Sequence, residues 1–284
     1  MLRFLKPKPP ELFFIRGYAK SGTNWLCNLM NLHPQVRCCG EFHFPTLFRG
    51  LLGEQEDLAA LLKKNENRPI LEDRLHQMIR DLVVDVCGPA RLCGDRTPCP
   101  LRSLIIPDSK TLYITRDGRD AMVSWTYHSM NLDIEEWPEM KAKVKQVQAD
   151  PNYFETHKNE LLSCEQSVRA FAAQWNAVVC DDFDVMRAAD RGEIPLDYHW
   201  VRYEDLHRDT LARRDEIYRF LNLKPKQAQP LTAKTEAGFG NGKTNRPHHF
   251  YRRGCAGTWQ EYFTDEQRNW FESEASEALQ LVAA

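Results

Sequence analysis

The sequence predicts an α/β fold in which a central, mostly parallel sheet is flanked by helices. Short apolar runs typical of strands alternate along the chain with longer stretches of helical periodicity. The first of these runs is followed by a glycine-containing turn and a helix, an order typical of phosphate-binding α/β units. Alternation of this kind favours parallel strands that are covered on both faces. We therefore expect a P-loop-like, three-layer fold.

The individual elements follow from their residue patterns. Apolar runs predict strands at 12–16, 91–94, 111–115 and 198–203. Helical spacing of apolar residues predicts helices after residue 22, over 70–86, from residue 168, over 209–222 and from residue 264. Asp117 and Thr264 are placed to cap the helices that follow them.

The domain organisation is predicted to be simple. No stretch rich in Gly, Pro or Ser divides the chain, so we expect residues 1–284 to form a single domain. The stretch 131–160 contains Pro138 and Pro151 and fits the alternation poorly. We interpret it as an insertion or lid close to the functional site.

The composition limits the classes of partner. The chain has 284 residues, with 38 Lys and Arg against 40 Asp and Glu, and a formal net charge of −2. Such a balance argues against a nucleic-acid coat protein or a polybasic membrane binder. No apolar run approaches the roughly 18–20 residues of a membrane span, and the N-terminus lacks a signal-peptide pattern. The nine cysteines include no C-x-x-C pair, which indicates reduced thiols and no zinc ribbon. We expect a cytoplasmic protein without a metal, a nucleic-acid partner or a membrane, and leave its oligomeric state open.

The turn after the first strand carries the residue types of a phosphate cradle. The segment KSGTNW supplies a cation at Lys20 and hydroxyl groups at Ser21 and Thr23. Gly22 lets the backbone approach an anion closely. In an ATPase P-loop the lysine follows the second glycine, whereas here it precedes Gly22. On this segment alone an ordinary polar turn is an equal alternative, and Trp25 fits core packing better than base stacking.

Two later segments supply further cations. Arg116 leaves the strand at 111–115 at the carboxyl edge of the predicted sheet, where open α/β sheets bind ligands. Ser124 lies about two helical turns farther along. The segment 241–254 (NGKTNRPHHFYRRG) contains four cations and no acid, which favours a multiply charged anion over a solvated surface.

Together these segments resemble the signature of the sulfotransferases that use PAPS (3′-phosphoadenosine 5′-phosphosulfate). KSGTNW is similar to the family's 5′-phosphosulfate loop, and Arg116 with Ser124 matches its 3′-phosphate pair, including the spacing. RRGCAGTW at 252–259 resembles the family's C-terminal R-K-G-x-x-G-x-W segment, and YEDL at 203–206 its strand end beside the adenine. The resemblance implies PAPS as co-substrate and a binding site formed by Lys20, Ser21, Gly22, Thr23, Asn24, Trp25, Arg116, Ser124, Tyr203, Phe239, Arg252, Arg253 and Gly254.

The catalytic base differs between subgroups of that family. Small-molecule cytosolic members carry a histidine in a T-H-L-P-like segment, but the corresponding stretch here, GDRTP at 94–98, has none. The segment GEFHF at 40–44 is instead similar to the tyrosylprotein and glycan sulfotransferases, in which a glutamate is the base. The resemblance implies that Glu41 is the general base, that His43 positions Glu41 or the acceptor, and that Lys20 stabilises the transferred group. The alternative is that Glu41 caps a loop and His43 is an ordinary polar residue.

The acceptor is not fixed by these motifs. A hydroxyl or amine on a small molecule or glycan is expected, and Glu41 with the 95–98 segment favours a sugar or another polar hydroxylated metabolite. A small-molecule kinase with an aberrant P-loop is a second hypothesis, and it predicts binding of ATP with Mg²⁺. A non-catalytic PAPS or PAP (3′-phosphoadenosine 5′-phosphate) binder is a third. His128 is expected to have a structural role. Trp125 belongs to an aromatic run with Tyr127, Trp137 and Tyr153 that could line the acceptor pocket, but core packing is the role expected for it.

Overall fold

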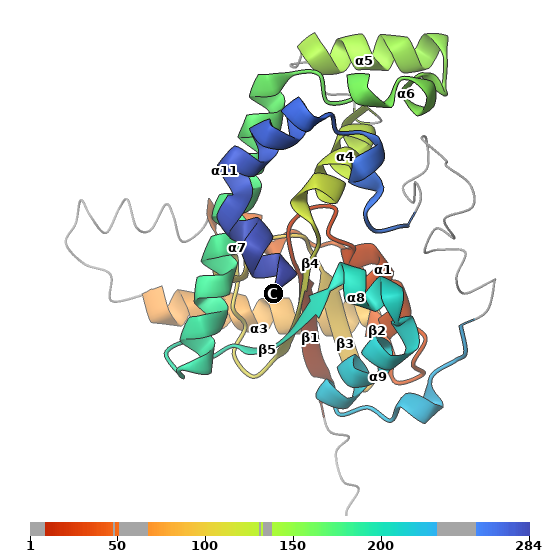
Figure 1. The fold of residues 1–284 in the computed structure, drawn as a ribbon. Helices are drawn as coiled ribbons and strands as arrows, with labels where there is room; N and C mark the ends of the chain where they lie inside the picture. Colours follow the sequence, from red (N-terminus) through yellow and green to blue (C-terminus); the bar gives the residue numbers. More distant parts are fainter. Residues whose placement is uncertain (1–8, 48, 51–67, 131, 133–137, 232–253) are drawn as a thin grey trace, which may run out of the picture.

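The computed structural model describes residues 9–47, 49–50, 68–130, 132, 138–231 and 254–284. Within them, the sheet has five parallel strands in the order β2-β3-β1-β4-β5 (Figure 1). The strands are β1 Glu11–Arg16, β2 Val36–Cys38, β3 Leu92–Arg96, β4 Lys110–Thr115 and β5 Asp197–Arg202. Helices lie on both faces of this sheet, so the predicted α/β three-layer fold is confirmed.

The helices in the described residues include every predicted one and also others that were not predicted. They are α1 Thr23–Met30, α3 Arg68–Cys87, α4 Gly118–Met130, α5 Pro138–Ala149, α6 Tyr153–Thr156, α7 Glu165–Asp190, α8 Tyr203–Arg208, α9 Thr210–Phe220 and α11 Asp265–Ala283. Those not predicted are α5, α6 and α8. Both predicted caps are present, since Asp117 Oδ1 accepts from the Arg119 backbone N–H at 2.9 Å and Thr264 forms a capping box with Gln267. The strand predicted over 198–203 ends one residue earlier, because Tyr203 begins α8.

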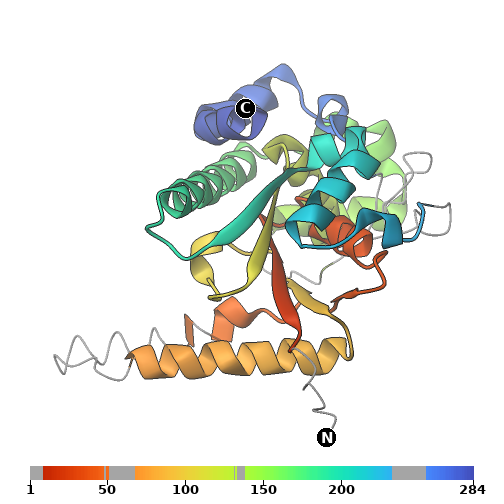
Figure 2. The same cartoon turned by 90° about the horizontal axis from the view of Figure 1, so that it is seen from below.

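The core is divided by the sheet. Phe13 and Ile15 of β1 pack with α1, α8 and α9 on one face, whereas Leu12 and Phe14 pack with α3 on the other. This alternation follows from the two-residue period of a strand. Figure 2 shows α3 on one side of the strands and α9 on the other. Long helix α7 covers the rest of the second face, where Tyr113 of β4 packs against Val185.

A helical layer lies beyond the carboxyl edge of the sheet. Helices α4, α7 and α11 share one apolar cluster, and α5 packs on α4 (Figure 1). The described part of the stretch 131–160 is therefore helical and contributes no strand to the sheet. None of the helices in the described ranges is both long and apolar enough to cross a bilayer.

Candidate functional site

The turns that follow the five strands meet at one edge of the sheet, because parallel strands all end on the same side. A cavity of about 410 Å³ opens there. The sequence-predicted residues that line it are Lys20, Gly22, Thr23, Asn24, Trp25, Glu41, His43, Arg116, Ser124, Tyr203 and Gly254. Ser21 lies in the same turn but below the surface. Phe239, Arg252 and Arg253 lie outside the described residues.

The turn between β1 and α1 has the backbone of a phosphate cradle. Lys20 has a φ of 69° and Gly22 a φ of 105°, both in the left-handed region. A Cβ at Gly22 would lie 2.6 Å from Tyr203 Cδ2, so only glycine fits without displacing that ring. The Ser21 hydroxyl is buried and has no hydrogen-bond partner within the described part of the chain. A buried hydroxyl in a glycine-bearing turn at a helix N-terminus fits an oxyanion.

Lys20 and Arg116 bring two positive charges to this cavity. Burial, together with the charge of Arg116, lowers the pKa of Lys20 to about 8, and the charge of Glu41 partly opposes this. Arg116 is itself buried and connects two segments, donating to the Lys20 carbonyl at 3.3 Å and to the Cys255 carbonyl at 2.9 Å. Its guanidinium carbon lies 4.3 Å from the centre of the Tyr203 ring. The cavity therefore favours an anionic ligand next to an aromatic wall.

Trp25 has a mixed role. Only 8% of it is exposed, and its ring meets that of Tyr203 edge to face at 5.2 Å, so it packs in the core as the local pattern indicated. The exposed part of the same side chain lines the cavity. Trp25 is therefore mainly a core residue that also borders the cavity.

A buried carboxylate fixes the loop that carries Glu41. Asp95 is fully buried at the end of β3 and pairs with Arg16 at 2.7 Å. Its other oxygen accepts from the Phe42 backbone N–H at 3.2 Å and from the Thr97 hydroxyl at 3.1 Å. Thr97 in turn accepts from the His43 backbone N–H at 3.3 Å. The loop after β2 is thus tied to the end of β3 by the two residues that directly follow Glu41.

The Glu41 side chain lies between Arg96 and His43. Its Oε2 atom lies 3.0 Å from Arg96 Nη1, and its Oε1 atom lies 4.0 Å from His43 Nε2. Glu41 is about one-third exposed, whereas His43 is 64% exposed and lies at the rim. The structure therefore brings the two candidate residues together, with Glu41 the more enclosed of them.

Two residues at this site differ from the sequence-based interpretation. His128 lines the cavity rather than the core, and burial and the charge of Lys20 lower its pKa while Glu41 opposes them. Trp125 is only partly buried and lines the cavity as well, so its expected core role is wrong. The signal for His128 was present in the sequence, because it lies four residues after Ser124 and shares a helix face with it.

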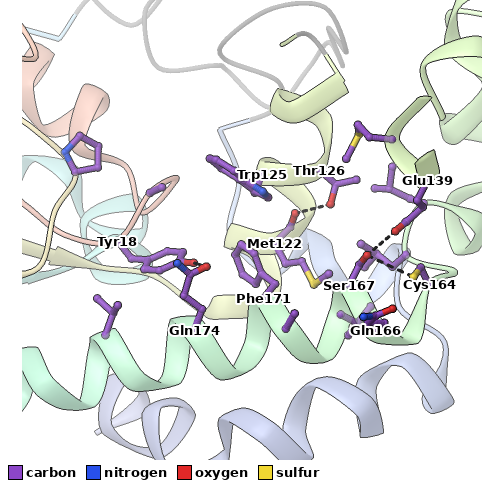
Figure 3. A pocket seen from close by; sticks show the side chains of 18 of the residues that line it. Tyr18, Met122, Trp125, Thr126, Glu139, Cys164, Gln166, Ser167, Phe171 and Gln174 are labelled. Atoms are coloured by element: carbon purple, nitrogen blue, oxygen red, sulfur yellow. Dashed lines mark hydrogen bonds between the residues drawn. The ribbon is translucent and has the colours of Figure 1, made fainter. Parts of the chain in front are cut away.

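A second, larger cavity of about 960 Å³ adjoins the first. Ala19, Pro98 and Trp125 line both, so the two cavities have a common wall. The remaining lining comes mainly from α4, α7 and the start of α5 (Figure 3). Its apolar lining residues include Met122, Met140, Leu161, Leu162, Val168 and Phe171. The arrangement is suited to a polar, anionic molecule in the first cavity and a largely apolar one in the second.

The comparisons with known proteins identify the family. The sequence model of the sulfotransferase domain matches residues 10–282. The chain belongs to the sulfotransferase family. Among curated relatives, this sulfotransferase is 26% identical to protein-tyrosine sulfotransferase 1 of Danio rerio over 132 residues, 43% of the chain and 37% of that protein. It is 27% identical to protein-tyrosine sulfotransferase 2 of Gallus gallus over 131 residues, 43% of the chain and 35% of that protein. The aligned part spans about a third of these relatives' length.

Solved structures share the fold of this sulfotransferase. A mouse sulfotransferase complexed with PAP superposes with a TM-score of 0.51 at 15% identity, covering 98% of this chain and 89% of that one. Retinol dehydratase in complex with retinol and PAP superposes with a TM-score of 0.50 at 20% identity, covering 96% of this chain and 82% of that one. These likenesses support the fold independently of the motifs.

Proposed function

We propose that this sulfotransferase moves the sulfuryl group of PAPS to a hydroxyl, or an amine, on an acceptor held in the larger cavity. The observation that carries the proposal is the meeting of the two cavities at Ala19, Pro98 and Trp125. Lys20 and Glu41 line the smaller cavity beside that common wall. A donor on one side and an acceptor on the other would meet next to both residues.

The residues of the smaller cavity fit PAPS and its product PAP. The buried Ser21 hydroxyl, the left-handed Gly22 and the charge of Lys20 suit the 5′-phosphosulfate. Arg116 and Ser124 suit the 3′-phosphate, and Arg116 Nε is buried without a partner among the described residues. Tyr203 and Trp25 offer aromatic surface to the base. Thr23, Asn24 and Gly254 complete the described wall, with Phe239, Arg252 and Arg253 expected to join it.

The chemistry assigned to the chain is proton removal and charge stabilisation. When bound, PAPS supplies the sulfuryl group, whose sulfur gains a bond to the acceptor oxygen as its bond to the 5′-phosphate breaks. Glu41 takes the acceptor proton, and Lys20 stabilises the negative charge left on the 5′-phosphate. His43 at the rim orients Glu41 or the acceptor. The buried links from Asp95 hold the Glu41 loop in place for this task.

The lining of the larger cavity favours an apolar acceptor over a sugar. Glycan recognition needs many hydrogen-bonding groups, whereas long stretches of this wall are Met, Leu, Val and Phe side chains. A neighbour in fold was solved with retinol, an apolar alcohol, and the curated relatives are named for protein tyrosine. Retinol and tyrosine each carry a hydroxyl on a largely apolar body. The start of α5 contributes Glu139 and Met140 to the wall, which supports the interpretation of 131–160 as an insertion beside the acceptor.

Two measurements test the proposed function. PAP at one hundred times its Kd should stabilise the fold by about 2.7 kcal/mol in a thermal-shift series, and Mg²⁺–ATP should not. In the second measurement, labelled sulfate should be transferred from PAPS to aliphatic alcohols and phenols. Stronger stabilisation by Mg²⁺–ATP would favour a kinase instead. Stabilisation by PAP without transfer to any of a wide range of acceptors would favour a non-catalytic binder.

A further inference from the structure

The larger cavity has a polar group at the end that lies away from the nucleotide cavity. Figure 3 shows Tyr18 and Gln174 at one end, Glu139 and Ser167 at the other, and Phe171 between them. The end with Tyr18 is next to Ala19, which both cavities share. Glu139 and Ser167 therefore lie at the far end.

The two ends are separated by a length that helix geometry fixes. Ser167 and Gln174 are seven residues apart on α7, which is about 10 Å along a helix axis at 1.5 Å per residue. Gln174 accepts a hydrogen bond from the Tyr18 hydroxyl at 3.3 Å, and Ser167 donates to the Glu139 carboxylate. An occupant that touches both ends must span this distance across an apolar middle.

The far end carries a carboxylate with unused acceptor capacity. Burial alone would raise the pKa of Glu139, but its hydrogen bonds from Lys143 and Ser167 outweigh burial and lower that pKa. Lys143 is almost fully buried and supplies the opposite charge. A carboxylate has about four lone-pair sites, so one remains for a ligand after the hydrogen bonds from Lys143, Ser167 and Cys164. Because Lys143 already neutralises the charge, a neutral donor fits better than an ammonium group, and a second carboxylate would be repelled.

We propose that the acceptor is an elongated, largely apolar molecule with a second hydroxyl group, which donates a hydrogen bond to Glu139 while the first is sulfated. The proposal rests on the proposed function for the role of the near end. It adds a distal recognition site that selects diols over the matching mono-alcohols. The Glu139 side chain is only 31% exposed, so a methyl group placed against it displaces water from the carboxylate without replacing the hydrogen bond, and this disfavours the mono-alcohol.

The probes are 1,n-alkanediols of eight, ten and twelve carbons, each with its 1-alkanol. Calorimetry with the PAP-loaded protein gives the affinities, and labelled PAPS gives kcat/KM. After correction for its two equivalent hydroxyls, the best diol should have an affinity and a kcat/KM that are each at least tenfold higher than those of the matching mono-alcohol. The matching ω-hydroxy acid should be the poorest ligand. Equal affinities for diol and mono-alcohol at every length would overturn the proposal.

A double substitution separates the distal site from general apolar binding. Glu139→Leu with Lys143→Met removes both charges together, so that neither is left buried and alone. The diol preference should fall to within about twofold. The control is the exposed pair changed in the same way, Lys158→Met with Glu261→Leu, which should keep the full preference. A preference that survives the Glu139–Lys143 substitution would also overturn the proposal.

If the proposed function is wrong, the results will differ from those expected when only the distal site is wrong. In that case PAP would not bind, or bound alcohols would not be sulfated, whatever their second group. Calorimetry on the PAP-loaded protein reads the diol preference without requiring turnover. The distal site and sulfuryl transfer are thus tested by separate measurements on the same samples.

Discussion

Arg96 Nη1 lies 3.0 Å from Glu41 Oε2, which pairs the candidate base with a cation from the neighbouring strand. Glu41 follows β2 and Arg96 ends β3, so the pair spans two adjacent strand ends. Both side chains are partly exposed, 34% for Glu41 and 22% for Arg96. The pair is therefore accessible to an acceptor, and its main effect is to fix the direction in which the carboxylate points.

Replacing Glu41 by Gln should reduce turnover and leave PAP binding intact. The amide keeps the shape of the side chain but does not take a proton, and loss of a general base costs roughly 10²–10⁴-fold in rate. Single-turnover transfer from labelled PAPS and calorimetry with PAP measure the two properties. Glu193→Gln, a change at an exposed surface residue, is the matched control. Near-normal turnover of the Glu41 variant would exclude Glu41 as the base.

Replacing Arg96 tests whether it positions Glu41. Arg96→Met removes the cation and the hydrogen bond at 3.0 Å, so we expect kcat to fall about tenfold or more with little change in PAP affinity. Arg96→Lys keeps the charge and should recover part of the loss. Arg102→Met, which breaks an exposed pair with Asp181, should have no effect on kcat. Equal losses in the Met and Lys variants would contradict a role that depends on charge.

The affinity for PAP should fall as the pH rises through about 8. Burial and the charge of Arg116 lower the pKa of Lys20 to about 8 in the free protein, so the side chain loses its charge above this pH. The phosphates of PAP are ionised throughout this range, with a second pKa near 6 for a phosphate monoester. We expect Kd to rise about tenfold for each pH unit well above the pKa of Lys20. Calorimetry between pH 7 and 9.5 measures this.

The same titration with Lys20→Arg is the control. Arginine stays charged over this range, so its Kd should be independent of pH even if PAP binds less well overall. A wild-type Kd that is equally flat would show that Lys20 is not the group that titrates.

The fold and most of the residues that line the smaller cavity could be predicted from the sequence, because the features that define them are local. Strand ends, the glycine turn and Arg116 are local features, and a parallel sheet brings all strand ends to one edge. The roles of Trp125 and His128 were wrong because which face of α4 meets a cavity depends on how α4 packs against α5 and α7. The pairing of Arg96 with Glu41 joins residues 55 apart, and no local pattern encodes such a contact.

Asp120 should be essential for the segment that closes the site beside Arg116. It is fully buried and accepts from the backbone N–H groups of Gly257 at 2.6 Å and Trp259 at 2.9 Å, and from the Thr258 hydroxyl at 2.9 Å. In Asp120→Asn, the amide NH₂ would face one of these donors. We expect the free energy of unfolding to fall by about 2–3 kcal/mol.

Chemical denaturation measures the loss of stability in this variant, and a titration with PAP measures its affinity for PAP. PAP affinity should also fall, because the same segment supplies the Cys255 carbonyl that holds Arg116. Asp184→Asn, at an exposed helical pair, should change stability by no more than about 0.5 kcal/mol. If Asp120→Asn is as stable as the wild type, Asp120 does not anchor the segment.

Asp182 should make the protein less stable as the pH rises from 5 to 8. Burial raises the pKa of Asp182 to about 7. The hydrogen bond that Asp182 accepts from the Leu101 backbone N–H at 2.6 Å lowers this pKa, but it offsets only part of the effect of burial. The unfolded chain releases this proton near pH 4, so between pH 4 and 7 the folded state binds more protons than the unfolded state, and raising the pH disfavours folding. Asp182→Asn removes this dependence and keeps an oxygen for Leu101. The difference in unfolding free energy between Asp182→Asn and wild type should therefore shift by about 2.6 kcal/mol in favour of the variant from pH 5 to 8. Urea denaturation at several pH values measures the shift, and a constant difference would mean that Asp182 is ionised in the folded protein throughout this range.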